Sequence, residues 1–407
     1  MEASGSQQIL IAGAGIAGLT AALAFAAKGF SVRIFERSAR LAEVGAGLQL
    51  SPNATRLLRQ LDVLDDLMPA AKPAAIALID GWTLRTITRV PLGDAAEKRW
   101  GAPYLVAHRA DLQNALAAKV TRHPDITLTL GALVRDVSAG QSGITASVKM
   151  DGQAVEANGL LLVGADGVWS RTRALLSPSA KSEPIGRIAW RSTVRTESPA
   201  GRAFAEIADM KSVSAFLHPA AHVVAYPLRS GSAINLVAVT SGAIRTEDWA
   251  SREDPQLLFN AIARMEPRLR ANIREAGLWT AWPLHTGATN APWTAPNIAL
   301  IGDAAHAMTP FAAQGAAMAI EDAVTLAEHV SAQPANVQAA LSAWEAERRP
   351  RLARVLKRGA LNRFAWHAAG PVAIARNVFL KARGPEKLAA DLDWLYGWDP
   401  APPVKSV

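Results

Sequence analysis

Ile9-Leu10-Ile11-Ala12-Gly13-Ala14-Gly15-Ile16-Ala17-Gly18 is the stretch that decides the fold of this chain. Its first four residues are apolar and are typical of a buried parallel strand. In the glycine pattern that follows, Gly13 permits a tight turn, Gly15 lets the backbone approach a pyrophosphate, and Gly18 lets the next helix pack close to the strand. The pattern predicts a helix over 16–28 whose N-terminal N–H groups favour a phosphate.

A second strand and an acidic residue follow at the spacing that a dinucleotide site needs. Residues 31–35 are predicted to form that strand, and Glu36 stands at its end. A carboxylate at this point is placed to accept a hydrogen bond from a ribose hydroxyl. The glycine pattern alone would also fit a tight strand-to-helix turn with no ligand. With the strand, the helix and Glu36 beside it, a nucleotide-binding unit is the better interpretation.

Two further turns containing glycine and aspartate follow predicted strands far along the chain. Gly164-Ala165-Asp166-Gly167 comes after the apolar run 160–163. Gly302-Asp303-Ala304-Ala305-His306 comes after the strand predicted over 298–301, and the segment continues to Gln314-Gly315. The order and spacing of the three turns favour one site for a large flavin nucleotide, FAD.

The two aspartates and the last glycine have different roles in such a site. Asp166 can hold a turn, or it can accept a hydrogen bond from a sugar or from the backbone. Asp303 is placed to accept from a polyol hydroxyl, although taken alone it could equally be a cap or turn residue. The helix that begins near Gly315 could direct its positive end at a developing negative charge.

Composition limits the class of protein. The chain has 407 residues, half of them apolar, which favours two intertwined globular domains plus a tail. The apolar stretch 9–27 lacks a basic region before it and is interrupted by glycines, so we do not expect an export signal. No other stretch offers the about 20 uninterrupted apolar residues of a membrane helix. We therefore expect a cytoplasmic protein without a membrane partner.

Charge and cysteine content narrow the partners. The formal net charge is +8, and the densest basic run lies at 347–358. Nucleic-acid binding would require this charge on one face with interleaved aromatic residues. A solvated helix face that attracts anionic cofactors and carboxylate substrates explains it better, and we expect no nucleic-acid partner. The absence of cysteine excludes disulfides and thiolate metal sites, and the histidines lack ligand-like spacing, so no metal site is expected.

The order of predicted elements indicates a discontinuous arrangement. Strand-like runs at 188–194, 213–217, 222–228 and 234–239 suggest an antiparallel sheet inserted into the nucleotide-binding fold. A helix is expected near Ser51-Pro52, with Ser51 as its cap, and others over 315–330 and 341–359. The domains follow from this order. They are an FAD-binding domain over 1–75, 100–180 and 280–340, a substrate-binding sheet over 76–99 and 181–279, and a helical tail over 341–407.

Three longer runs resemble a known family: Val44-Gly45-Ala46-Gly47-Leu48-Gln49-Leu50-Ser51-Pro52-Asn53, His108-Arg109-Ala110-Asp111-Leu112, and residues 302–322. Over nearly its whole length the chain resembles the class A, single-component FAD-dependent aromatic hydroxylases, in particular the salicylate and 6-hydroxynicotinate hydroxylase branch. The resemblance implies an α/β fold. Its parts are a Rossmann-like FAD-binding domain of the para-hydroxybenzoate hydroxylase type, an inserted antiparallel β-sheet substrate domain, and C-terminal helices.

The resemblance also implies a cofactor site and a reaction. NADH or NADPH would reduce non-covalently bound FAD, and a flavin C4a-hydroperoxide formed with O₂ would hydroxylate a phenolic aromatic acid or a hydroxylated N-heteroaromatic. The loop 44–49 would border the flavin ring, Arg109 would contact the phosphates or ribityl chain, and Asp303 would hold the ribityl chain. The residues expected to bind the cofactor are Gly13, Gly15, Ile16, Ala17, Gly18, Glu36, Arg37, Gly47, Gln49, Arg109, Asp166, Asp303, Gly315 and Ala316.

Such a reaction needs a base near neutral pH, and histidine has a suitable intrinsic pKa. His222 and Tyr226 are four residues apart on a predicted strand and would line one wall, where members of this branch commonly place a His and a Tyr. An ordinary half-buried His and Tyr would show the same spacing. His218 is a competing histidine, and His306 a weaker one. Trp190-Arg191 could belong to the substrate wall or could be a core tryptophan beside a surface arginine.

Two departures from the family leave the substrate open. Ala307 stands where relatives often have proline, and Pro310 offers no donor to a substrate carboxylate. The sequence fits decarboxylative as well as simple hydroxylation of the substrate. It also fits either NADH or NADPH as the reductant, and either a monomer or a homodimer. An FAD-dependent dehydrogenase or reductase without oxygen insertion, and a binding protein with a vestigial cofactor site, are the alternative functions.

Overall fold

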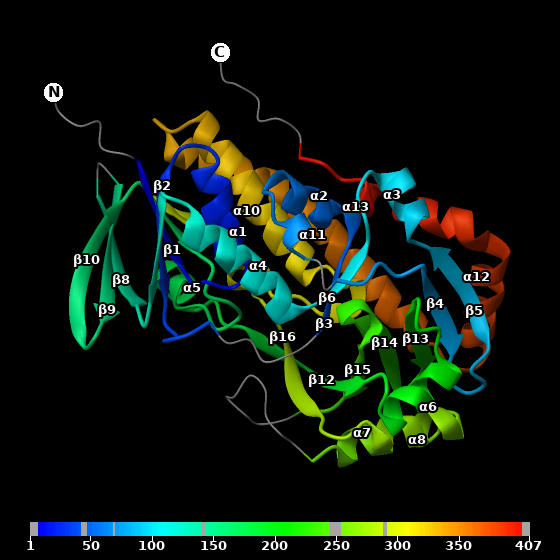
Figure 1. Ribbon diagram of the computed structural model, residues 1–407. Helices are drawn as coiled ribbons and strands as arrows, with labels where there is room; N and C mark the ends of the chain where they lie inside the picture. Colours follow the sequence, from blue (N-terminus) through cyan, green and yellow to red (C-terminus); the bar gives the residue numbers. More distant parts are fainter. Residues whose placement is uncertain are drawn as a thin grey trace.

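The structure is a computed structural model that describes residues 7–41, 47–67, 70–140, 143–243, 254–287 and 291–400. Two large sheets lie side by side and long helices from the C-terminal part of the chain pack along them (Figure 1). The expected fold class is confirmed. The arrangement brings the ends of one sheet's strands to one face of the other.

The nucleotide sheet has six strands in the order β17-β18-β11-β1-β2-β7. All neighbours are parallel except β17 and β18. Its strands are β1 (Gln8–Ala12), β2 (Ser31–Glu36), β7 (Ile126–Leu130), β11 (Leu161–Gly164), β17 (Thr294–Ala295) and β18 (Ile298–Leu300). Because parallel strands end at the same edge, the turns after β1, β11 and β18 lie together there.

Each face of the nucleotide sheet is covered. Helices α1 (Ile16–Ala26), α4 (Arg109–Arg122) and α10 (Gly315–Ala332) share one apolar core with β1. On the other face, Leu10 packs in a core with residues of a three-stranded antiparallel sheet. That sheet consists of β8 (Leu133–Gly140), β9 (Gly143–Met150) and β10 (Gln153–Gly159). Helix α1 ends two residues earlier than predicted, because the chain turns into the left-handed region at Gly29, where φ is +87°.

The substrate sheet has seven strands in the order β16-β12-β15-β14-β13-β4-β5. Its strands are β4 (Ala75–Asp80), β5 (Thr86–Pro91), β12 (Glu183–Arg195), β13 (Val213–His218), β14 (Ala221–Leu228), β15 (Ala233–Ser241) and β16 (Thr280–Thr286). The four strand-like runs of the sequence are therefore confirmed as β12 to β15. The domain boundaries stay a prediction; β16, which lies in the range expected for the nucleotide domain, pairs with β12.

Only one face of the substrate sheet is closed by its own helices. Trp190, Phe216 and Leu236 form a core with α6 (Pro199–Ile207), α7 (Gln256–Ala261) and α8 (Pro267–Glu275). The opposite face turns toward the nucleotide sheet and toward the C-terminal helices α11 (Val337–Trp366), α12 (Gly370–Ala390) and α13 (Asp393–Tyr396). Helix α11 is longer than the predicted 341–359. Helix α12, which lies against β5, falls within the helical tail expected over 341–407, although its bounds were not predicted (Figure 1).

Short elements connect the two sheets. They are β3 (Gly47–Leu50), α2 (Pro52–Gln60), η1 (Leu64–Asp66), α3 (Asp94–Trp100), β6 (Leu105–His108), α5 (Arg171–Leu176), η2 (Arg229–Gly231), α9 (Asp303–His306) and η3 (Pro310–Ala312). Ser51 does precede α2, but the expected side-chain cap is wrong. Its hydroxyl instead donates to Asn53 Oδ1 (2.6 Å) and accepts from Gln314 Nε2 (2.9 Å), so it links α2 to the start of α10.

A buried ionic network fastens α11 to α10. Arg348 Nη1 lies 2.6 Å from Glu321 Oε2, and Arg348 Nε lies 2.9 Å from Asp322 Oδ1, with all three side chains almost fully buried. Arg351 contacts the other oxygen of Glu321 at 2.7 Å. Asp322 Oδ2 in turn contacts His306 Nε2 at 2.5 Å and accepts from the Gly302 N–H at 3.0 Å. The network therefore reaches from the C-terminal helices to the turn after β18.

Candidate active site

One cavity of about 1220 Å³ lies between the strand ends of the nucleotide sheet, the open face of the substrate sheet, and helices α11 and α12. Residues from all three sequence motifs line it. Of the residues expected to bind the cofactor, the structure places all but Gly18 on its wall: Gly13, Gly15, Ile16, Ala17, Glu36, Arg37, Gly47, Gln49, Arg109, Asp166, Asp303, Gly315 and Ala316. Residues 44–46 of the expected flavin loop lie outside the described residues.

The first turn has the geometry of a phosphate cradle. Gly13 has a φ of +104°, and a Cβ there would lie 2.6 Å from the carbonyl oxygen of Ala165 in the second turn. A Cβ on Gly18 would lie 1.9 Å from the Gly13 oxygen, so Gly18 serves the close packing of α1. At Gly15 no atom lies within 4 Å of an added Cβ, and the backbone is open to the cavity. This room at the start of an eleven-residue helix fits the pyrophosphate of FAD.

Two acidic residues at the cavity are held by backbone N–H groups. Glu36 accepts from the Ala14 N–H at 2.8 Å and from the Ser38 N–H at 2.9 Å, which fixes its carboxylate beside the first turn. Asp166 accepts from the N–H groups of Arg171 (2.8 Å) and Thr172 (3.0 Å), and from the hydroxyl of Ser170. The Asp166 carboxylate therefore holds the turn into α5, which is the first of the two roles considered for it.

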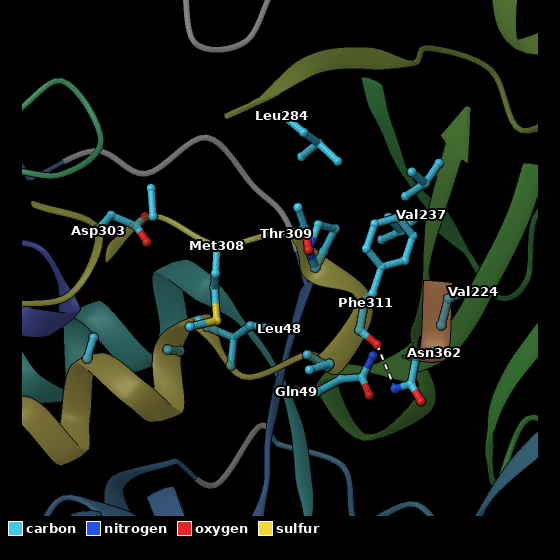
Figure 2. Close-up of a pocket in the computed structure, with 18 of the residues that line it drawn as sticks. Leu48, Gln49, Val224, Val237, Leu284, Asp303, Met308, Thr309, Phe311 and Asn362 are labelled. Atoms are coloured by element: carbon cyan, nitrogen blue, oxygen red, sulfur yellow. Dashed lines mark hydrogen bonds between the residues drawn. The ribbon is translucent and has the colours of Figure 1, made fainter. Parts of the chain in front are cut away.

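Arg173 joins the second and third turns, and sequence reasoning missed it. Its buried guanidinium donates to the carbonyl oxygens of Val168 (2.5 Å) and Ala304 (3.0 Å). The Asp303 side chain faces the same cavity at the start of α9. Figure 2 shows Asp303 at one end of the pocket and Val224 and Val237 of the substrate sheet at the other, with Met308 and Thr309 between them.

Strand β14 supplies both predicted catalytic side chains to the opposite wall. His222 and Tyr226 line the cavity, as their four-residue spacing predicts, and both are buried. The His222 ring lies 5.3 Å from the Phe311 ring and 4.9 Å from the Trp366 ring, centroid to centroid. The loop that carries Phe311 is held by Asn362, whose Nδ2 donates to the Phe311 carbonyl at 2.9 Å (Figure 2).

His222 has a partner from the C-terminal helices. His222 Nδ1 lies 3.3 Å from His367 Nε2, and His367 Nδ1 lies 2.9 Å from the carbonyl oxygen of Arg363. Burial lowers the pKa of His222 well below its usual 6.5, and His367 and Arg187 lower it further. Burial likewise lowers the pKa of His367; the hydrogen bond to the Arg363 carbonyl opposes this, while the charges of Arg187 and Arg363 add to it. Both imidazoles are therefore neutral at neutral pH.

Tyr226 of β14 lies against β3, on the cofactor side of the cavity. A Cβ on Gly47 would lie 2.7 Å from Tyr226 Oη, and the Gly47 N–H donates to Asn235 Oδ1 at 2.8 Å. Burial raises the pKa of the Tyr226 hydroxyl, against an opposing effect of Arg191. Gln49, also expected near the flavin, accepts from the Tyr104 hydroxyl at 2.6 Å. The cofactor side and the substrate side of the cavity are thus in direct contact.

The competing residues lie elsewhere, with one exception. His218 packs against Trp82, centroids 4.7 Å apart, and His306 contacts Asp322; neither lines the cavity. Trp190 is fully buried and donates to Thr240 Oγ1, as a core residue. Arg191 does line the cavity, with its guanidinium carbon 5.1 Å from the Trp282 ring centroid.

A family model described as an FAD binding domain matches residues 6–359 of this chain. The chain is 31% identical over 396 residues to the 3-hydroxybenzoate 6-hydroxylase of Polaromonas naphthalenivorans (strain CJ2), and the match covers 96% of each protein. The chain belongs to the FAD-dependent aromatic monooxygenases. It is also 30% identical over 357 residues to the 6-hydroxynicotinate 3-monooxygenase of Pseudomonas fluorescens, covering 86% of this chain and 90% of that protein.

Solved structures agree with this monooxygenase fold. A salicylate hydroxylase in a substrate complex superposes with a TM-score of 0.81 at 22% identity, covering 98% of this chain and 97% of that chain. Membership of the monooxygenase family favours oxygen insertion over the dehydrogenase and binding-protein alternatives. Among the described helices of this monooxygenase, none is long and apolar enough to cross a membrane. The described residues also contain no cluster of His, Asp and Glu suited to a metal ion.

Proposed function

We propose that this monooxygenase hydroxylates a phenolic aromatic acid or a hydroxylated N-heteroaromatic, with NADH or NADPH as reductant. The observation that supports this is the pair His222 and Tyr226, which faces the Asp303 side of the same cavity across an apolar space. Bound FAD would supply the activation of O₂ for transfer of one oxygen atom to an electron-rich ring. The residues that would hold it are the cavity-lining residues of the three turns.

The hydrogen bonds around His222 define which nitrogen can act as a base. A carbonyl oxygen only accepts, so His367 Nδ1 carries the proton of its bond to Arg363. In neutral His367, Nε2 is then an acceptor, and His222 Nδ1 must be the donor to it. Nε2 of His222 is left with a free lone pair. We infer that this nitrogen takes the proton of the substrate hydroxyl.

His367 provides a route by which a proton can leave His222. When the substrate O–H bond breaks and a proton binds His222 Nε2, the proton on His222 Nδ1 can pass to His367 Nε2. The positive charge then rests on His367, which is partly exposed at the C-terminal end of α11, and not on the fully buried His222. His367 is thus proposed as a positioning and relay residue, because a fully buried imidazolium is less favourable than one in contact with solvent.

Arg191 is the proposed anchor for a substrate carboxylate. It lines the cavity from β12, where it lies opposite Val237 of β15, and Val237 in turn lies opposite Val224, which stands between His222 and Tyr226 on β14. A guanidinium can bind a carboxylate with two parallel hydrogen bonds. An aromatic acid held by Arg191 would present its ring to the apolar side chains of Val224, Val237 and Leu284 (Figure 2). These side chains also help to exclude water from the ring.

The experiment is a screen of phenolic and hydroxypyridine acids for stimulated NAD(P)H oxidation, scored by the mass of the product. A gain of one oxygen atom supports the proposal. His222→Gln should slow hydroxylation by about 10²–10⁴-fold while FAD stays bound, the usual range for general acid–base catalysis. His218→Gln, on the neighbouring strand but outside the cavity, is the matched control. NAD(P)H oxidation that forms only peroxide with every acid would refute the proposed substrate class.

His367 is tested by two substitutions. His367→Gln can still accept from His222 Nδ1 but cannot carry a proton, whereas His367→Phe can do neither. If His367 relays protons, both variants lose kcat with little change in KM, and added imidazole restores part of the rate. If His367 only holds the His222 ring, His367→Gln keeps the rate of the unmodified enzyme, and the relay is excluded.

The remaining parts of the proposal are the use of NADH or NADPH, which the family resemblance implies, and a monomer or homodimer in the cytoplasm, which the sequence led us to expect.

A further inference from the structure

The cavity extends well beyond the strand that carries His222 and Tyr226. In the substrate sheet β14 is followed by β13, β4 and β5, and neighbouring strands of a sheet lie about 4.8 Å apart. Cavity-lining residues occur on all of these strands, so the cavity continues for about 14 Å from β14 to the edge of the sheet. A single aromatic ring bound beside His222 would leave this part empty.

The floor of this extension is apolar. The described residues of β13, β4 and β5 that line it are Val213, Ala215, Ile76, Leu78 and Val90. Pairing places them in register: Val213 lies opposite Ile76, and Ala215 opposite Leu78. Since paired residues project to the same face, these side chains form one continuous surface. None of them can form a side-chain hydrogen bond with a ligand.

Helix α12 forms the roof. Val372, Ala375, Phe379 and Leu380 line the cavity from this helix. We name the space between these four residues and the five residues of the floor the apolar chamber. The nearby arginines of α12 have partners: Arg376 donates to the Ala365 carbonyl at 2.7 Å, and Arg383 pairs with Asp391. The guanidinium groups of these two arginines are therefore held by hydrogen bonds to other protein atoms, and the four residues of α12 named above present carbon surface to the chamber.

The apolar chamber reaches the surface through apolar side chains. Val372 and Phe379 line the cavity and are 48% and 60% exposed. Leu361 and Phe364 of α11 also line the cavity, with 56% and 66% exposed. Exposed apolar side chains at the mouth of a cavity are typical of a site for an apolar ligand. A ligand that enters here meets these side chains before it reaches His222.

We propose that the apolar chamber binds an alkyl or alkenyl substituent of the aromatic substrate, so that the enzyme acts on a chain-substituted phenolic compound. The inference rests on the proposed function for the position of the ring. It adds that the ring is held at His222 and Tyr226 while the chain runs beneath α12 toward β5. The chamber accounts for specificity through burial of methylene groups, each of which contributes a similar increment of affinity.

The test is a homologous series of phenolic acids with unbranched chains from methyl to octyl. Binding to the FAD-loaded enzyme is followed by the change in tryptophan fluorescence, and turnover by product mass. We expect Kd to fall about fourfold for each added methylene until the chamber is full, and then to level off. A Kd that does not depend on chain length would overturn the proposal.

Two variants locate the effect. Ala375→Phe fills part of the apolar chamber, so Kd should level off at a shorter chain, and Leu380→Ala should move that point to a longer chain. Ala382→Phe, on an exposed position of the same helix that does not line the cavity, is the matched control and should leave the point unchanged. An identical levelling-off point in all three variants would show that the chain binds elsewhere.

The outcomes separate this inference from the proposed function. Tight binding of long-chain phenols with no oxygen in the product would contradict the proposed function and leave the chamber intact. Efficient hydroxylation of unsubstituted phenolic acids, with no dependence on chain length, would support the proposed function and contradict the proposed role of the apolar chamber. Equal displacement of the alkylphenol by a fatty acid of the same length, without turnover of the alkylphenol, would assign the chamber to a lipid chain and overturn the proposal.

Discussion

Replacement of Arg348 by methionine tests how the C-terminal helices support the cofactor turn. Methionine is shorter than arginine but keeps most of the volume of the side chain, and it removes the charge shared by Glu321 and Asp322. Removing one partner of a buried ion pair costs about 3–5 kcal/mol, because the other charge stays buried. Glu321 keeps Arg351, and Asp322 keeps His306, so we expect the lower end, about 3 kcal/mol.

Urea unfolding followed by tryptophan fluorescence measures this loss. With a denaturant slope of about 3 kcal/mol per molar, a loss of about 3 kcal/mol moves the midpoint down by about 1 M. Asp322 also accepts from the Gly302 N–H, so a weaker network should loosen the turn that carries Asp303 and raise the Kd for FAD. Both changes should occur in the same variant.

Two comparisons decide whether the network is responsible. Lys357→Met removes an exposed charge from the same helix and should change stability by no more than about 0.5 kcal/mol. In the double variant, Glu321→Gln also removes the charge that Arg348→Met leaves with fewer partners. The loss of unfolding free energy in the double variant should therefore be smaller than the sum of the losses in the two single variants. A midpoint for Arg348→Met equal to that of Lys357→Met would refute the reasoning.

Three further predictions follow from the site. Gly13→Ala should weaken FAD binding at least tenfold in a flavin-release titration, because its φ is +104° and the new Cβ would meet the Ala165 oxygen; unchanged affinity would contradict the cradle. The acid limb of kcat/KM should lie below pH 6.5, because the lowered pKa of His222 keeps it neutral as the pH falls; a midpoint above 6.5 would exclude His222 as the base. Burial opposes ionisation of Asp322, but His306 and Arg348 outweigh it and lower its pKa from 3.8 to about 2. About 2 kcal/mol of stability should therefore be present above pH 4 and be lost as the pH falls to about 2, and acid unfolding of Asp322→Asn should lack this component.

The parts of the fold that depend on local pattern were predictable. The glycine turn after β1 and the strand-like runs of β12 to β15 are encoded by neighbouring residues, and the structure has them where they were expected. Helix α12 falls within the predicted helical tail, but its bounds were not predicted, because its exposed face carries Ile374, Val378 and Phe379 and so lacks the usual polar side. The failed cap at Ser51 has a similar cause: a tertiary partner, Gln314, competes for the hydroxyl.

The site was predictable only as separate pieces. The spacing of His222 and Tyr226 on one strand placed both on the cavity wall, because strand periodicity is local. His367 is 145 residues away from His222, on a helix end with no recognisable motif, and no sequence pattern pairs them. Arg173 was missed for the same reason, since it acts through backbone carbonyls that any residue type can provide.

Gly47 and Tyr226 are in contact with no space for even a methyl group between them. The residues expected to hold the cofactor and those beside the substrate ring therefore cannot shift independently. The distance over which an oxygen atom must travel is thereby set at β14, the central strand of the substrate sheet. Strands β13, β4 and β5 lie beyond β14 and take no part in this contact. Side-chain changes on these outer strands can therefore alter the fit of a substrate without disturbing the contact between Gly47 and Tyr226.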